Sequence, residues 1–287
     1  MILVIGKNGQ LARAIKSLDS NVHCLGREDI DLVNSEGCLT TIAKLKPSGI
    51  INASAYTAVD LAESNKHEAF ELNADAVKNI AHAAKKLGVH FVHVSTDYVF
   101  SGDKGSPYLP NDEHKPLNRY GESKAAGETL LLSSFTERTC ILRTSWVYSV
   151  FGNNFVKTMI ELMASKPQLQ VIDDQIGSPT SAHTLAKACL AALNNCLTGV
   201  HHVTDEGVAS WYDFAVAIQD IAVAKGLIET RVPIYPVSSS AFQTPAKRPT
   251  YSVLSKTSLK QALPDLTLNH WRDELEIVIN QLSINKI

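Results

Sequence analysis

A hydroxyl-rich triplet, STD at 95–97, closes a hydrophobic run, and Tyr120 and Lys124 follow four positions apart. On a helix such a pair shares one face and can reach one site. A phenol can protonate a carbonyl oxygen whose carbon receives hydride, and a nearby ammonium stabilises the phenolate left behind. The Thr96 hydroxyl can polarise the same carbonyl. These residues indicate carbonyl reduction, with Thr96, Tyr120 and Lys124 as the catalytic residues.

We expect the Lys124 ammonium, together with the cationic nicotinamide ring of an oxidised cofactor, to lower the pKa of Tyr120, because a phenol of ordinary pKa, about 10, is a slow base in the reverse reaction. The alternative is structural. Tyr120 would then be a helix-surface aromatic residue, and Thr96 would cap the end of a strand.

A glycine-rich turn, VIGKNGQLA at 4–12, separates the first expected strand from the first expected helix. Such a turn lets backbone N–H groups approach a pyrophosphate at a helix N-terminus. Ala12 replaces the usual third glycine, which serves helix packing rather than phosphate contact. The turn predicts dinucleotide binding, and an ordinary tight turn is the alternative.

The segment HCLGRED at 23–29 has no acidic residue placed to accept a ribose 2′-hydroxyl, and Arg27 stands nearby. A guanidinium there can pair with a 2′-phosphate, so NADPH is expected, with NADH still possible. The alternative is that Arg27 is an ordinary surface residue.

Short hydrophobic runs alternate with helical patterns through the first half of the chain. This alternation predicts an α/β, Rossmann-like, doubly wound parallel sheet. Strands are expected at 2–5, 22–25, 49–52, 89–95 and 139–145, and helices at 10–18, 35–45, 66–87 and 118–134.

Beyond about residue 150 turn-rich segments join helices at 152–165, 183–195, 210–224 and 270–282. We therefore expect a dinucleotide-binding domain at 1–150 and a smaller, mostly C-terminal α/β substrate-binding lobe at 151–287. The two are expected to interleave, with a strand near 169–172 and a helix near 183–195 returning to the first domain.

Composition narrows the function classes. The 287 residues are 45% hydrophobic with a net charge of −2, which offers no basic field for nucleic acid, and no stretch is long and apolar enough for a membrane span. The five cysteines show no metal or redox spacing, and no leader precedes the first strand, so a cytoplasmic protein is expected. His201 and His202 should point to opposite faces of an extended segment and make a poor chelate.

Several motifs follow one another along nearly the whole chain. They are GKNGQLA (6–12), INASAYTAVDLAE (51–63), STDYVFSG (95–102), PLNRYGESKAAGE (116–128), ILRTSWVY (141–148), GNNFV (152–156), DDQIGSPT (173–180), SWYDFA (210–215) and RPTYSVLS (248–255). In these motifs the chain resembles the extended short-chain dehydrogenase/reductases and, within them, the dTDP-4-dehydrorhamnose reductases.

The resemblance implies roles for further residues. Those expected at the cofactor are Gly6, Gly9, Gln10 and Leu11 at the pyrophosphate, Asp31 and Leu32 at the adenosine end, Ala53, Ala55 and Thr57 on the inner side, and Tyr120 and Lys124. Those expected at a nucleotide-sugar are Thr96, Asp97, Val99, Tyr120, Trp146, Asn154 and Arg248. Trp146 could equally be a core residue. A guanidinium at Arg248 suits a diphosphate.

The implied reaction is NADPH-dependent reduction of the C4 keto group of dTDP-4-dehydro-L-rhamnose to dTDP-L-rhamnose. One alternative is a reductase of another nucleotide-linked 4-keto-6-deoxy sugar that gives the C4 epimer. The other is a non-catalytic dinucleotide-binding module resembling the regulatory subunit of methionine adenosyltransferase. Some relatives form magnesium-bridged dimers through an acidic residue in the first helix, but Ala14 stands at that place, so no metal site is expected. The oligomeric state, monomer or homodimer, stays open.

Overall fold

Six strands pair into one parallel sheet in the computed structural model, which describes residues 1–284. The sheet order is β10-β5-β4-β3-β1-β2. The strands are β1 (Ile2–Ile5), β2 (His23–Leu25), β3 (Gly49–Asn52), β4 (His90–Thr96), β5 (Thr139–Thr144) and β10 (Gly199–His202). Because β1 pairs with both β2 and β3, the direction in which the chain progresses across the sheet reverses at β1.

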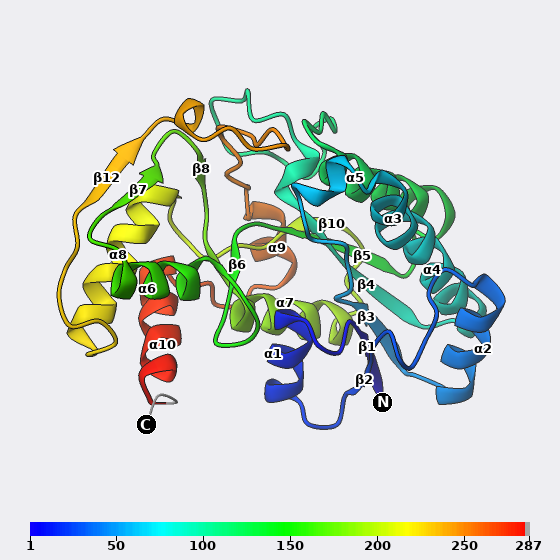
Figure 1. The fold of residues 1–287 in the computed structure, drawn as a ribbon. Helices are drawn as coiled ribbons and strands as arrows, with labels where there is room; N and C mark the ends of the chain where they lie inside the picture. Colours follow the sequence, from blue (N-terminus) through cyan, green and yellow to red (C-terminus); the bar gives the residue numbers. More distant parts are fainter. Residues whose placement is uncertain (285–287) are drawn as a thin grey trace.

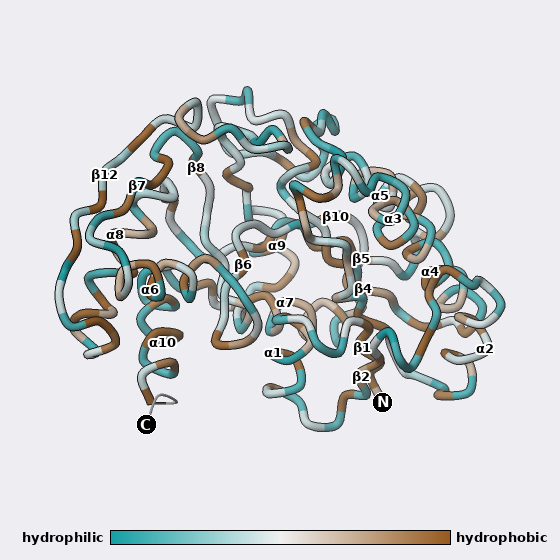
Figure 2. Tube along the Cα trace, in the orientation of Figure 1, coloured by the Kyte–Doolittle hydropathy of each residue, from teal (hydrophilic) through white to brown (hydrophobic). Residues whose placement is uncertain are grey.

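Helices cover both faces of this sheet (Figure 1). Val4, Val92 and Leu142 face α1 (Gln10–Leu18) and α7 (Ala182–Asn194), with α9 (Thr257–Ala262) beside them. Leu3 and Phe91, on the opposite face, pack under α2 (Ser35–Leu45), α4 (Ala76–Leu87) and α5 (Arg119–Ser134). Hydrophobic segments run through the central strands near the β1 and β4 labels in Figure 2. Burial on both faces explains why these strands are nearly continuous hydrophobic runs.

A second hydrophobic core holds the smaller lobe, on the left in Figure 1. It is built from α6 (Phe155–Ser165), α8 (Trp211–Ala224) and α10 (Trp271–Ile284), packed against a two-stranded parallel sheet of β7 (Leu169–Ile172) and β12 (Ile234–Val237). Two short pairs complete the strands: β6 (Val147–Tyr148) with β9 (Thr180–Ser181), and β8 (Ile176–Gly177) with β11 (Ala209–Ser210).

The strand at 169–172 does not return to the main sheet, contrary to the sequence-based expectation. It pairs with β12, while β10 takes the position beside β5. Leu169 and Val171 are buried in the second core, which fixes this strand in the lobe. The expected helix near 183–195 forms as α7 and packs on α1 and the sheet. His202 is buried and His201 is partly exposed, as expected for neighbours on opposite faces of a strand.

The expected single helix at 66–87 is interrupted. It consists of α3 (Lys66–Phe70), a π-turn η2 (Glu71–Asp75) and α4, preceded by the short 3₁₀ turn η1 (Leu61–Glu63). In the π-turn the buried Asn73 amide bonds to Tyr56 N, Tyr56 O and Ser123 Oγ. Such turns re-aim side chains inside helices, and periodicity alone does not reveal them. Two further 3₁₀ turns are η3 (Asp97–Val99) and η4 (Ser239–Ala241).

No helix among residues 1–284 is both long and apolar enough to cross a membrane.

Gly127 lets α5 touch the π-turn, and its replacement tests this contact. A Cβ at Gly127 would stand 2.1 Å from the Asn73 carbonyl oxygen. We expect Gly127→Ala to lower the free energy of unfolding by about 2 kcal/mol through overpacking. Chemical denaturation measures it. Gly105→Ala, where a Cβ meets nothing within 4 Å, is the control, with an effect below about 0.5 kcal/mol. Equal effects of the two changes would contradict this account.

Candidate active site

A large cavity of about 1140 Å³ lies at the carboxyl ends of the central strands. Its wall includes Gly6 after β1, Gly26 after β2, Ala53 after β3, Thr96 at the end of β4 and Ser145 after β5. Ligands of doubly wound folds bind in this crevice, where the strand order reverses. The smaller lobe contributes Trp211, so the cavity reaches both parts of the fold.

The glycine-rich turn forms one wall of the cavity. Gly6 has φ +111°, and a Cβ there would stand 2.9 Å from the Ala53 backbone. Gly9 caps α1 without a side-chain hydrogen bond, so the first-turn N–H groups of α1 have no capping acceptor. A close backbone approach and an uncapped helix N-terminus suit a pyrophosphate. The turn therefore fits a dinucleotide, and Gly6, Gly9, Gln10 and Leu11 all line the cavity.

The expected adenosine end lies beside β2. Arg27, Asp31 and Leu32 line the cavity there. The Asp31 carboxylate accepts from Val33 N and Asn34 N, which shapes its own loop. Lys7 also lines this end and pairs with Glu28 at 3.0 Å and Asp29 at 3.3 Å. Of the charged side chains here, Arg27 has no such carboxylate partner among the ion pairs of residues 1–284. The inner-side residues Ala53, Ala55 and Thr57 line the cavity as well.

Thr96, Tyr120 and Lys124 all line the cavity, so the structure brings the three predicted catalytic residues together. Thr96 ends β4, where its Oγ1 donates to Asp97 Oδ1 at 3.0 Å and accepts from Tyr98 N. Tyr120 and Lys124 lie one turn apart in α5, which Asn118 caps through Gly121 N. The cavity thus holds a hydroxyl, a phenol and an amine in one place.

Burial raises the pKa of Tyr120 to about 12, against a hydrogen bond with Thr96. The protein alone therefore raises this pKa, and the expected lowering by Lys124 together with the oxidised nicotinamide stays a prediction. Lys124 Nζ points to the β4 backbone and donates to Val94 O at 2.7 Å. Burial also lowers the pKa of Lys124 to about 8. At neutral pH the phenol is therefore protonated, as a proton donor must be.

Asp97 is a second acid in this wall. Its side chain is buried, and burial raises the pKa of its carboxyl to about 7 in spite of hydrogen bonds from Ser252 and Thr96. A carboxyl whose pKa is raised in this way can stand beside Thr96 as an acid that donates a hydrogen bond or as a carboxylate that accepts one.

Trp146 lines the lobe side of the cavity in a strained conformation. Its φ is +49°, in the left-handed region that non-glycine residues rarely adopt. Its ring stacks on Trp211 with centroids 3.6 Å apart and an interplanar angle of 10°. Gly177 faces the ring, and a Cβ there would stand 2.8 Å from it. The stack supports a functional position for Trp146, since strain of this kind persists only where the surroundings impose it.

Three residues expected at the substrate do not line the cavity: Val99, Asn154 and Arg248. Val99 is 0% exposed in a small core under α5 and does not line the cavity, so its expected role at the substrate stays a prediction. Asn154 caps α6 and donates to Gln10 Oε1 at 2.9 Å, which links the lobe to the glycine-rich turn.

Arg248 is engaged by an acid from the other part of the fold. It binds Asp60 through both terminal nitrogens, at 3.1 and 2.7 Å, and also Thr244 and Ala246. This ion pair ties the segment after β3 to the C-terminal segment 244–248.

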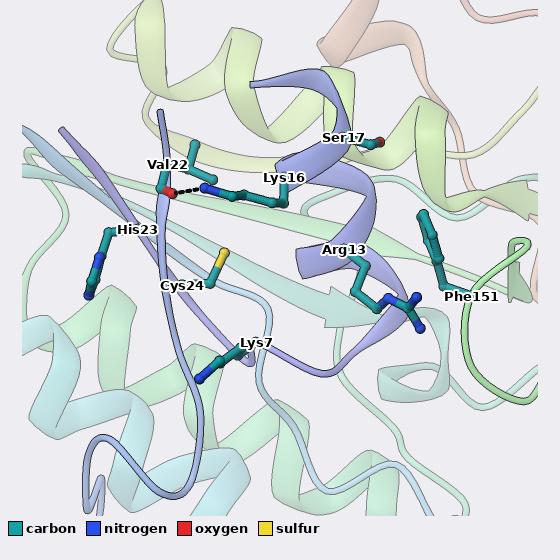
Figure 3. A pocket seen from close by; sticks show the side chains of 8 residues that line it. All are labelled: Lys7, Arg13, Lys16, Ser17, Val22, His23, Cys24 and Phe151. Carbon is teal, nitrogen blue, oxygen red and sulfur yellow. Dashed lines mark hydrogen bonds between the residues drawn. The ribbon is translucent and has the colours of Figure 1, made fainter. Parts of the chain in front are cut away.

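A second, smaller hollow of about 510 Å³ lies on the outer side of α1 (Figure 3). Several basic side chains line it, but Lys16 and Arg13 are already in contact with other groups of the protein. Lys16 Nζ donates to Ser20 O and Val22 O, and the Arg13 guanidinium lies 4.4 Å from the centre of the Phe151 ring. It is lined by none of the three predicted catalytic residues, so the larger cavity is the candidate site.

The sequence analysis missed the buried ion pair that anchors α5. Arg143 on β5 contacts both carboxylate oxygens of Glu128, at 2.6–3.0 Å, with both side chains nearly inaccessible. Burial raises the pKa of Glu128, but the His114 hydrogen bond and the Arg143 charge outweigh it and lower that pKa below its ordinary value. A glutamate and an arginine fifteen residues apart carry no sequence signal of such pairing.

Comparisons with known proteins match nearly the whole chain. The family model of the RmlD substrate binding domain matches residues 1–284. A dTDP-4-dehydrorhamnose reductase of Sinorhizobium fredii is 39% identical over 282 residues, covering 95% of this chain and 94% of the relative.

Two solved structures are similar over nearly their full length. A dTDP-4-dehydrorhamnose reductase from Clostridium acetobutylicum has a TM-score of 0.91 and 38% identity, covering 98% of this chain and 99% of its own. A second, from Bacillus anthracis in complex with NADP, has a TM-score of 0.90 and 33% identity, covering 98% of each chain.

The buried ion pair gives a test of how α5 is held. Arg143→Met leaves the Glu128 carboxylate buried without its partner, so we expect a loss of about 3–5 kcal/mol in the free energy of unfolding. The matched control is Arg119→Met, which breaks the exposed pair with Glu122 on the same helix and should cost less than about 1 kcal/mol. Urea denaturation compares them, and similar losses would refute the anchoring role.

Proposed function

Because the chain belongs to the family of the RmlD substrate binding domain, with the dTDP-4-dehydrorhamnose reductases as relatives, we propose that it reduces the C4 keto group of dTDP-4-dehydro-L-rhamnose. The product is dTDP-L-rhamnose. The observation that carries the proposal is the convergence of Thr96, Tyr120 and Lys124 beside a glycine-rich turn. That set argues against a purely regulatory binding module, which needs no proton donor.

Residues of the cavity wall would hold NADP(H). Gly6, Gly9, Gln10 and Leu11 bind the pyrophosphate through the uncapped N-terminus of α1, as the Gly6 cradle and the bare Gly9 cap support. Asp31 and Leu32 border the adenosine, and Ala53, Ala55 and Thr57 line the inner side. The cofactor, when bound, supplies the hydride. The relative from Bacillus anthracis was solved with NADP, which supports the same cofactor here.

Tyr120 gives the proton in this mechanism. Its pKa of about 12 keeps the phenol protonated at neutral pH, and the proton passes from Tyr120 Oη to the C4 oxygen as that oxygen gains negative charge. The Thr96 hydroxyl donates to Asp97 in the structure, and it would turn its O–H to the C4 oxygen to orient the carbonyl when the sugar binds. Lys124 supplies positive charge behind the phenolate and a donor for the cofactor ribose.

The substrate's sugar would lie between the catalytic residues and Trp146, with Asp97 beside it. Arg248 serves the diphosphate through a change of partner. In the structure its guanidinium is bound by Asp60, so a diphosphate must displace that carboxylate. Asn154 acts through its bond to Gln10, which joins substrate and cofactor regions.

We place the protein in the cytoplasm as a monomer or homodimer without a resident metal. All five cysteines are free, as in a reducing compartment. Ala14, at the position of the relatives' acidic residue, is buried in the core and offers no ligand.

Removal of the phenol tests the chemistry. We expect Tyr120→Phe to lower kcat by about 10²- to 10⁴-fold, because the general acid is lost while the ring remains. Absorbance of the reduced nicotinamide follows the reaction with the 4-keto sugar, and NMR identifies the C4 configuration. Tyr235→Phe, at an exposed tyrosine of the lobe, is the control. Full activity of Tyr120→Phe, or a C4-epimeric product, would overturn the respective part of the proposal.

Cofactor preference is the second test. Arg27 lines the cavity beside β2, so Arg27→Ala should raise KM for NADPH about tenfold and leave KM for NADH nearly unchanged, since only NADPH carries the 2′-phosphate. Steady-state kinetics with both cofactors measures the difference. Equal effects on the two would remove Arg27 from phosphate recognition.

A further inference from the structure

His93 lies behind the catalytic lysine, in the middle of β4 and three residues before Thr96. Its imidazole is 0% exposed and stands between two side chains. His93 Nε2 is 3.3 Å from Lys124 Nζ, and His93 Nδ1 is 3.2 Å from Asn52 Nδ2. The ring thus connects Lys124 to β3, and none of the roles described above uses it.

The orientation of the Asn52 amide follows from its neighbour. Asn52 Oδ1 accepts from the Ser54 backbone N–H at 3.1 Å and from Ser54 Oγ at 2.6 Å. A backbone N–H can only donate, so the amide oxygen must face Ser54 and the amide nitrogen must face His93. Asn52 therefore offers a donor to His93 Nδ1.

The histidine tautomer follows in turn. Nδ1 accepts from Asn52, so in the neutral ring the proton resides on Nε2, which faces Lys124. An ammonium at Lys124 can also only donate, so two donors, the ammonium and His93 Nε2–H, would face each other unfavourably. A neutral amine would instead accept from Nε2–H through its lone pair and still donate to Val94 O at 2.7 Å.

We propose that His93 is a positioning residue that lowers the proton affinity of Lys124 by presenting Nε2–H to it, so that Lys124 titrates within the working pH range. This inference rests on the reductase activity proposed above. It assigns the charge state of the catalytic lysine to a residue that touches neither substrate nor cofactor.

Other charged groups around Lys124 act in both directions. Burial lowers its pKa to about 8, and the Glu128 charge one turn along α5 raises it. Glu128 is itself paired with Arg143 of β5, and His114 Nε2 lies 3.2 Å from its carboxylate. Burial and the Lys124 charge hold the pKa of His93 well below its ordinary value, so the ring stays neutral. Other titratable groups on the elements that pack around Lys124 include Tyr120 and Glu122 on α5, His90 on β4 and Cys140 on β5. Asp97, directly after β4, and His202 on β10 are buried nearby.

Activity should depend on this charge. Reduction needs the ammonium form of Lys124 to stabilise the phenolate that Tyr120 leaves, so kcat/KM should fall as pH rises through about 8. His93→Gln replaces Nε2–H by a carboxamide whose oxygen can face the ammonium. We expect the alkaline limb to move up by about one pH unit, a tenfold change in proton affinity.

His90→Gln is the matched control, because it makes the same change at the other end of β4, opposite Gly49. Its alkaline limb should coincide with that of the wild type. A merely structural role for His93 would lower activity or stability without moving the limb. An unmoved limb in His93→Gln overturns the proposal.

A second readout needs no turnover. A lysine whose pKa is depressed in the folded state makes stability rise with pH between that pKa and about 10, because the unfolded chain binds the extra proton. The thermal unfolding temperature of the wild type should therefore rise more between pH 8 and 10 than that of His93→Gln. The rise for His90→Gln should equal that of the wild type. Equal gains would reject the role of His93 even if no sugar were reduced. Unequal gains without turnover would retain it and reject only the reductase.

Discussion

The buried attachment of α5 to strands β4 and β5 is the constraint on which the site depends. Glu128 and Arg143 pair without access to solvent, and one turn earlier Lys124 donates to the Val94 carbonyl. Separating a buried carboxylate from its partner is strongly destabilising. The pair therefore fixes the rotation of α5 about its axis and its distance from the sheet. That rotation places Tyr120 over the end of β4, next to Thr96.

Two glycines allow this close approach. A Cβ at Gly121 would stand 2.2 Å from Tyr98 O, and one at Gly127 would stand 2.1 Å from Asn73 O. Helix glycines cost intrinsic stability, which packing must offset. Here they let α5 lie directly on the π-turn and on the segment after β4. The glycines weaken the helix, but they allow the Tyr120 phenol and the Lys124 amine to lie against β4, the strand that carries Thr96.

The same burial that fixes the residues also sets their protonation. It raises the pKa of Tyr120 and Asp97 and lowers that of Lys124, so the acid is protonated and the lysine is easily discharged. Contacts between the two parts of the fold complete the cavity. Asp60 holds Arg248, and Gln10 accepts from Asn154, so the glycine-rich turn and the lobe are connected through side chains at both ends.

The sequence by itself predicted the doubly wound sheet and the glycine-rich turn, because both depend on local periodicity and turn chemistry. It also predicted that Thr96, Tyr120 and Lys124 share one site, from their setting after a strand and from the family resemblance, and all three line the cavity. It did not determine that 169–172 pairs with β12, that a π-turn containing Asn73 interrupts the helix, or that Val99 is buried. Nor did it reveal the pairing of Glu128 with Arg143 or the contact of His93 with Lys124. Those features, and the upward direction of the Tyr120 pKa, depend on which distant segments exclude water from a side chain, and only the tertiary structure decides that.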